Sequence, residues 1–194
     1  MDLVFKWKKN LDLITLILVG SIPAALFGFL FRKTLEETFN SLTLLSISYL
    51  VTVLLLFSTK LIRAGKGDKK EKSLKEVKIL DAVVIGLFQA LAILPGISRS
   101  GATIVAGLWS GLSASAAFTF SFYLAIPAIL GASLLEFPKM LEQSGGWGLG
   151  LLGMVISAVT SYFAILGLEK VLKSKKLFIF GWYCLVLAIL LLFR

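Results

Sequence analysis

An arginine lies where a charged side chain is energetically expensive. Arg99 is the only charged residue between Ala82 and Leu135, and the residues on both sides of it are apolar enough for a lipid bilayer. A charge at that depth costs on the order of 2.5 kcal/mol or more, so ionisable residues inside membrane segments usually mark functional sites. The guanidinium group offers a planar fork of five N–H donors that matches phosphate oxygens and stays charged when desolvated. The expected chemistry is binding of a phosphate or a similar anion within the membrane.

The residues around Arg99 also suit an anion. Ser98, Ser100 and Thr103 supply hydroxyl donors, and Gly101 lets backbone N–H groups approach a ligand closely. A helix that begins near Gly101 directs its positive N-terminal end at the same place. These features predict that Ser98, Arg99, Ser100, Gly101 and Thr103 bind phosphate groups.

A structural hinge is the alternative explanation for this run. In a hinge, the hydroxyl side chains would satisfy freed backbone groups while Arg99 paired with a carboxylate or with carbonyl groups. The apolar segment that holds Arg99 contains no acidic residue. The anion site is therefore the favoured interpretation.

Other polar residues are less informative. Gln89 lies six residues before Pro95, where its amide could either orient a bound phosphate or bond a neighbouring helix, and both interpretations stay open. Asp81 is expected to cap the start of the same helix. The chain has no histidine, which removes the commonest general base and metal ligand, and the residues themselves indicate no metal site.

The elements that must carry these residues are membrane helices. The chain has 194 residues, of which 58% are hydrophobic, and a helix needs about 20 apolar residues to cross the hydrocarbon core. We predict one all-α polytopic membrane domain over residues 1–194. Its uncharged stretches cover residues 13–31, 38–59, 82–98, 100–135, 143–168 and 177–193.

The basic residues predict an orientation in the membrane rather than a nucleic-acid partner. The net charge is +9, but the lysines and arginines gather in short segments between the apolar runs. Residues 6–9, 60–78 and 170–176 together hold 15 of the 20 Lys and Arg residues. Short loops rich in these residues stay on the cytoplasmic side. The three segments are therefore placed inside.

This orientation predicts a helix pair that enters the membrane and returns on the same side. Two full crossings around Arg99 would place residues 170–176 outside, against the charge rule. Residues 81–94 form about 21 Å of helix, which is too short to cross, and Pro95 then ends it. We predict a re-entrant helix-loop-helix over residues 79–112, with about five transmembrane helices beside it. Its tip, residues 95–101, lies partway through the membrane.

The run from Gly86 to Thr103 carries a family resemblance. Its centre reads Pro-Gly-Ile-Ser-Arg-Ser-Gly-Ala-Thr, which resembles the second signature of the bacterial undecaprenyl-diphosphatases of the bacitracin-resistance type. Residues 20–24, residues 117–135 and the closing helices are also similar to this family, so the resemblance covers nearly the whole chain. It implies a membrane hydrolase that removes the terminal phosphate of undecaprenyl diphosphate and so recycles the lipid carrier for cell-wall peptidoglycan.

The resemblance also implies a site and a setting. In this family, two re-entrant pairs in an inverted repeat form one site that opens outward. Ser98, Arg99, Ser100 and Thr103 match the phosphate-binding positions of the second tip, with Arg99 and Ser98 as the expected catalytic residues. A divalent cation (Mg²⁺ or Ca²⁺) is the expected cofactor. The expected partners are a polyprenyl diphosphate lipid and the membrane, with a homo-oligomer as a further option, and the expected location is the bacterial inner membrane.

The sequence departs from the family pattern in one respect. The first family signature, an acidic pair followed by a serine-rich loop and a histidine, has no counterpart here, and ligands for the cation are not evident. The chain resembles the family from the end of its first full-length helix onward. We therefore expect a fragment that binds the lipid diphosphate with impaired catalysis. The alternative function is a transporter or flippase, or a non-catalytic binder of an anionic lipid phosphate.

Overall fold

The computed structural model describes residues 7–31, 41–64, 70–142, 147–174 and 176–193. Within these ranges the chain is helical, which confirms the all-α prediction. The elements are α2 (Trp7–Leu30), α4 (Leu42–Ala64), the short 3-10 helix η1 (Leu74–Glu76), α5 (Ile79–Leu91), α6 (Arg99–Trp109), α7 (Ala114–Glu142), α8 (Trp147–Lys173) and α9 (Ile179–Leu192).

Four of the described helices are long and apolar enough to cross a membrane, which confirms a multi-pass membrane protein. The candidate spans are Asp12–Leu30, Leu42–Leu61, Ala114–Leu135 and Gly150–Lys173. The closing helix α9 is also apolar but has 14 residues, or about 21 Å of helix. The fifth full crossing therefore stays a prediction.

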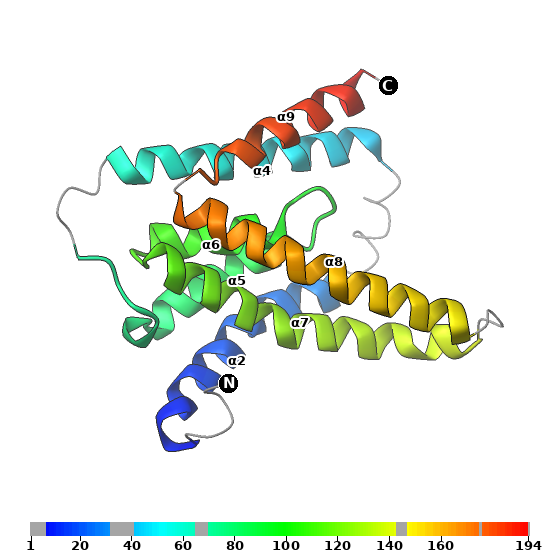
Figure 1. Cartoon of the computed structure of the whole chain (residues 1–194), viewed down its shortest axis with the longest axis horizontal. Helices are drawn as coiled ribbons and strands as arrows, with labels where there is room; N and C mark the ends of the chain where they lie inside the picture. Colours follow the sequence, from blue (N-terminus) through cyan, green and yellow to red (C-terminus); the bar gives the residue numbers. More distant parts are fainter. Residues whose placement is uncertain (1–6, 32–40, 65–69, 143–146, 175, 194) are drawn as a thin grey trace.

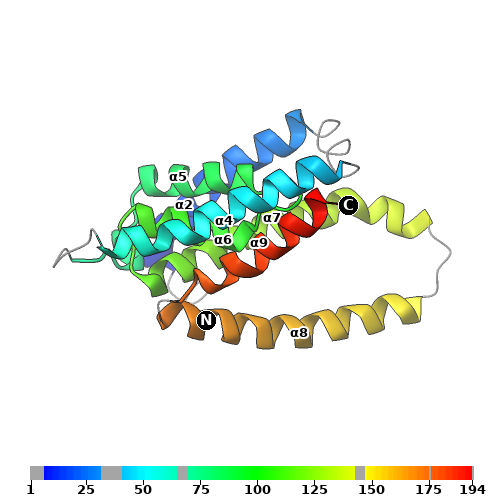
Figure 2. The ribbon, with the colours of Figure 1, turned by 90° about the horizontal axis from the view of Figure 1, so that it is seen from above.

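The helices surround α6, whose residues from Gly101 to Leu108 are all buried. Figure 1 shows α4 and α9 packed together along one side, α5, α6 and α7 in the middle, and α2 on the opposite side. In the view of Figure 2, α8 stands apart from the other helices over most of its length. Within its span from Gly150 to Lys173, only Leu172, near the end, is buried.

The helix-loop-helix around Arg99 forms close to the predicted positions. The first helix, α5, ends at Leu91 rather than at residue 94. Its expected last turn is replaced by tight turns, in which the N–H groups of Ile93 and Leu94 donate to the carbonyl groups three residues earlier. The second helix begins at Arg99, two residues before the expected Gly101, because Ser98 caps it. Between them the chain reverses at Gly96.

Both ends of this helix pair meet at Lys72. The Lys72 N–H donates to the Gly111 carbonyl at 2.9 Å, and the Ser113 N–H donates to the Lys72 carbonyl at 2.9 Å. The Lys72 Nζ atom lies 2.9 Å from Oδ1 of Asp81, at the start of α5. Asp81 also accepts the Lys78 N–H, which confirms its predicted capping role. The chain therefore leaves and re-enters this region on one side of the molecule.

The Lys72–Asp81 ion pair is expected to stabilise this closure. Asp81→Asn keeps a group that can accept the Lys78 N–H but removes the charge that faces Lys72, and hydrogen bonds to charged groups are worth about 1.5–3 kcal/mol. We expect a measurably lower Tm in detergent. The matched control is Glu169→Gln, which breaks the exposed Glu169–Lys173 pair and is expected to cost about 0.5 kcal/mol or less. Equal effects of the two substitutions would contradict this account.

The close crossing of α2 and α5 depends on two glycines. A Cβ atom added at Gly86 would overlap the Gly20 carbonyl oxygen, and one added at Gly20 would lie 3.0 Å from the Ala82 carbonyl oxygen. Small residues allow this approach of helix backbones in membranes.

We expect Gly86→Ala to force α2 and α5 apart and to destabilise the protein by about 1–3 kcal/mol, the usual cost of overpacking. The matched control is Gly153→Ala in α8, where an added Cβ meets nothing within 4 Å and helix propensity favours alanine. Thermal unfolding in the same detergent compares the two variants. A Gly86→Ala protein as stable as Gly153→Ala would refute the close crossing.

Candidate functional site

The loop between α5 and α6 is fastened by a threonine from another helix. Thr52, near the middle of α4, donates its hydroxyl to the Gly96 carbonyl at 2.9 Å and accepts the Ser98 N–H at 3.1 Å. Its side chain is 1% exposed. Nothing in the sequence marked Thr52 as a site residue beyond a hydroxyl within an apolar span. Thr52 fixes the loop at about half the length of α4.

Gly96 lets the loop turn against α4. Its φ angle is +90°, a conformation that side chains disfavour. An added Cβ would also lie 2.9 Å from the Leu45 carbonyl oxygen and 2.9 Å from the Ser48 Cβ. The glycine is therefore required both by the backbone angle and by the close packing of the loop on α4.

The N-terminus of α6 opens toward the loop. Ser98 Oγ accepts the Gly101 N–H at 3.1 Å and so caps the helix. Because that oxygen acts as an acceptor, its own hydrogen stays available for a ligand. In the described part of the chain, the N–H groups of Arg99 and Ser100 have no hydrogen-bond partner. The first turn of α6 thus combines hydroxyl and backbone donors beside one positive charge.

Arg99 lines a cavity of about 520 Å³ between α6, α7 and α8. Its side chain is half-buried, and no carboxylate among the described residues forms an ion pair with it. This observation favours the anion site over the hinge. We call this space the Arg99 cavity; its lining residues are Arg99, Ser100, Ser121, Phe122, Ala125, Ile126, Ile129, Ser161, Ala164, Ile165 and Leu168.

A second cavity of about 530 Å³ lies between α4, α6, α8 and α9 and is also lined by residues of the loop. We call it the α9 cavity. It shares Ser100, Ala164 and Leu168 with the Arg99 cavity. Its remaining lining residues are Tyr49, Thr52, Leu56, Gly96, Ile97, Ser98, Gly101, Ile104, Leu177, Phe180, Tyr183 and Cys184.

Two predicted site residues do not line either cavity. Thr103 is 1% exposed; its hydroxyl donates to the Arg99 carbonyl at 2.8 Å and lies 2.6 Å from Ser121 Oγ. Gln89 is 2% exposed, and neither atom of its amide has a partner among the described residues. Thr103 thus supports the backbone of Arg99 from within the helix bundle. The structure brings Ser98, Arg99, Ser100 and Gly101 together at the cavities and leaves Gln89 apart from them.

The described residues do not fit the divalent cation that the family resemblance implies. No cluster of three or more His, Cys, Asp or Glu side chains occurs in the described ranges. Neither cavity is lined by a carboxylate from the described ranges, and Asp81 is engaged with Lys72. The polar groups that line the cavities are instead the guanidinium group of Arg99, hydroxyls and the first turn of α6.

Comparison with known proteins confirms the resemblance noted in the sequence. The family model of the bacitracin resistance protein BacA matches residues 3–190. An undecaprenyl-diphosphatase of Thermosipho africanus is 40% identical over 187 residues, covering 96% of this chain and 71% of the relative. One of Methanothermobacter thermautotrophicus is 39% identical over 183 residues, covering 91% of this chain and 97% of the relative. One of Halothermothrix orenii is 37% identical over 194 residues, covering 98% of this chain and 73% of the relative.

Proposed function

We propose, from the premise that this chain belongs to the family of the bacitracin resistance protein BacA, that it is an undecaprenyl-diphosphate phosphatase of the bacterial inner membrane. Its substrate would be the lipid diphosphate, and its product the monophosphate that returns to cell-wall synthesis. The names of the relatives support the reaction. The observation that carries the site is Arg99, a half-buried guanidinium group beside a cavity with no carboxylate partner in the described part of the chain.

The reaction needs negative charge to be neutralised on a phosphoryl group. The oxygen of a water molecule forms a bond to the terminal phosphorus, and the bond from that phosphorus to the bridging oxygen breaks. The lipid monophosphate and inorganic phosphate leave. Arg99 would contact the phosphoryl oxygens bidentately, and the Ser98 and Ser100 hydroxyls with the N–H groups of the first turn of α6 would donate to the same oxygens. Such preorganised donors are usually the largest catalytic term.

A general base is the part of this mechanism that the described residues do not supply. The chain contains no histidine, and in the part of the chain that the structure describes no carboxylate lines either cavity. General acid–base groups contribute typically 10²–10⁴-fold to a rate. We therefore expect these 194 residues alone to bind the lipid diphosphate well and to hydrolyse it slowly.

The helix pair α5–α6 would place the phosphates inside the membrane. Both of its ends meet at Lys72, in a segment rich in basic residues that the charge rule places in the cytoplasm. Its tip is bonded to Thr52 near the middle of α4. A re-entrant hairpin over residues 79–112 accounts for both contacts. Irregular backbone at that depth is tolerated because it lines a cavity.

Phosphate release from vesicles tests the proposed function. The purified chain, reconstituted with undecaprenyl diphosphate, is expected to release inorganic phosphate above protein-free vesicles and to bind the lipid saturably. Movement of the lipid between leaflets with no phosphate release would instead support a flippase. Saturable binding with neither release nor movement would support a non-catalytic binder. Absence of saturable binding would overturn both the site and the function.

A further inference from the structure

Lys60, in the last part of α4, has its ammonium group against aromatic rings. Its Nζ atom lies 4.0 Å from the centre of the Phe178 ring and 5.8 Å from the centre of the Phe57 ring. A cation within about 6 Å of a ring centre is attracted by the negative face of that ring. The two rings therefore hold one positive charge in place beside the start of α9, which Phe178 precedes.

The aromatic residues around Lys60 join α4 to α9. A Cβ atom added at Gly181 would lie 2.8 Å from Cε1 of Phe57, so the Phe57 ring packs directly on the backbone of α9. Trp182 meets the same ring edge-on, with the ring centres 5.2 Å apart. We call Phe57, Lys60, Phe178 and Trp182 the Lys60 cluster. Because its members come from two helices, the tertiary structure sets the position of the lysine.

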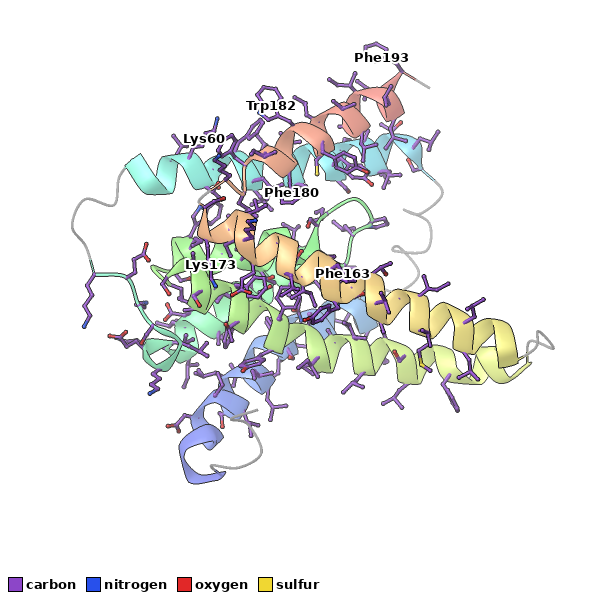
Figure 3. The ribbon with its side chains drawn as sticks, viewed as in Figure 1. Lys60, Phe163, Lys173, Phe180, Trp182 and Phe193 are labelled. Atoms are coloured by element: carbon purple, nitrogen blue, oxygen red, sulfur yellow. The ribbon has the colours of Figure 1, made fainter. Side chains whose placement is uncertain are left out.

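The Lys60 cluster faces the surroundings of the bundle. Lys60 is exposed, and Trp182 is 55% exposed. In the view of Figure 3, both lie on the side of the α4–α9 pair that points away from α5 and α7. Lys60 is also the second-last residue of the candidate membrane span Leu42–Leu61. An exposed cation and an indole ring at this position would contact lipid near its headgroups.

The charges near the Lys60 cluster favour an anion. Residues 60–78 and 170–176, which adjoin the cluster in the sequence, hold 12 basic and 3 acidic residues. No carboxylate among the described residues forms an ion pair with Lys60. Like charges in such number repel one another, and a bound anion reduces that repulsion. The ammonium group of Lys60 is thus positioned by rings and lacks a described counter-ion.

We propose that the Lys60 cluster binds the headgroup phosphate of an anionic membrane phospholipid, with an acyl chain of that lipid against Phe57 and Trp182. Basic sites between membrane helices on the cytoplasmic side are typical binding places for such headgroups. The charge rule places this end of α4 on that side. The inference is independent of the proposed function, because the cluster shares no residue with either cavity.

A phospholipid fits this cluster better than a soluble anion does. The exposed indole of Trp182 and the half-buried Phe57 ring supply apolar surface close to the ammonium group of Lys60. A phospholipid carries a phosphate and hydrocarbon in one molecule, whereas inorganic phosphate carries only the first. Because α4 and α9 both contribute to the cluster, a bound lipid would also hold these two helices together.

Quenching of Trp182 fluorescence by brominated lipids tests this proposal. The full chain is reconstituted in phosphatidylcholine vesicles that contain a lipid brominated near the headgroup end of its acyl chains, either phosphatidylglycerol or phosphatidylcholine. The chain has four tryptophans, so the Trp182 signal is the difference between the unchanged chain and the Trp182→Phe protein. We expect phosphatidylglycerol to bind about fivefold more strongly than phosphatidylcholine, the effect of one lysine near a membrane surface.

Substitutions of Lys60 separate this site from the general charge of the surface. Lys60→Gln is expected to lower the preference for phosphatidylglycerol to within about twofold, because it removes the local charge. Lys60→Arg keeps the charge and can also stack on the rings, so it should retain the preference. Lys75→Gln is the matched control, since Lys75 is an exposed lysine of the same basic segment with no ring contact among the described residues. Its preference should equal that of the unchanged chain.

Three results would overturn the proposal. Equal quenching by the two lipids in the unchanged chain would show that the cluster does not select an anionic headgroup. Equal losses in the Lys60→Gln and Lys75→Gln proteins would assign the preference to the total charge of the surface. Loss of the preference in excess inorganic phosphate, at constant ionic strength, would indicate a site for the free anion. None of these results bears on phosphate release, by which the proposed function is tested separately.

Discussion

The Arg99→Gln protein is expected to bind a lipid diphosphate at least 100-fold more weakly than the unchanged chain. Among the described residues, Arg99 is the only charged one that lines either cavity, so glutamine removes the positive charge of the site while keeping two N–H donors. Charge-assisted hydrogen bonds contribute about 1.5–3 kcal/mol each, and a bidentate contact forms two of them. Equilibrium binding of radiolabelled undecaprenyl diphosphate in nanodiscs measures the loss.

This loss is expected without damage to the fold. No described carboxylate pairs with Arg99, so its removal leaves no buried charge unpaired, and Tm should stay the same or rise. Arg99→Lys is the matched variant: it keeps the charge but cannot contact two phosphate oxygens in one plane, and an intermediate affinity is expected. An Arg99→Gln protein with unchanged affinity would show that the guanidinium group does not bind the phosphates.

Thr52→Val is expected to impair the site from a distance. Valine has nearly the shape of threonine but cannot bond the Gly96 carbonyl or the Ser98 N–H, both of which Thr52 holds. Each buried backbone group left unpaired costs about 1–3 kcal/mol. The loop should therefore move, and a displacement of about 1 Å at a reacting centre can cost about 100-fold in rate. Phosphate release by the reconstituted protein measures the effect.

The kinetic pattern distinguishes loop positioning from a general loss of stability. Thr52→Ser keeps the hydroxyl and is expected to restore most of the rate, while Thr52→Val should lower kcat more than it raises KM. Ser46→Ala is a further control, because it removes a hydroxyl of α4 that bonds the Ala188 carbonyl of α9 instead of the loop. If Ser46→Ala and Thr52→Val reduced the rate equally, Thr52 would have no special role in positioning the loop.

Local sequence features predicted much of this structure because they act over short distances. Pro95 and Gly96 interrupt the helix, and Gly111 turns the chain at a φ of +89°. The long apolar runs likewise predicted helices of membrane length, and Arg99 marked the position of a cavity that it lines. These effects depend on neighbours within a few residues.

Contacts between distant segments were not predictable in the same way. Thr52 meets Gly96 across 44 residues, and Ser121 meets Thr103 across 18, yet each is an ordinary hydroxyl in an apolar helix, which most often bonds its own backbone. Thr103 was predicted to bind phosphate but bonds Ser121 and the Arg99 carbonyl. Its type and position in the motif did not reveal the direction of its side chain.

We propose that Arg99 binds the phosphates of a membrane lipid within the bundle. The most direct test is a structure of the chain in nanodiscs with a non-hydrolysable polyprenyl diphosphate analogue. We expect the diphosphate in the Arg99 cavity, within hydrogen-bond distance of the guanidinium group and the Ser100 hydroxyl, both of which line it. An Arg99 side chain bonded to protein groups, with the diphosphate outside the cavity, would contradict the account.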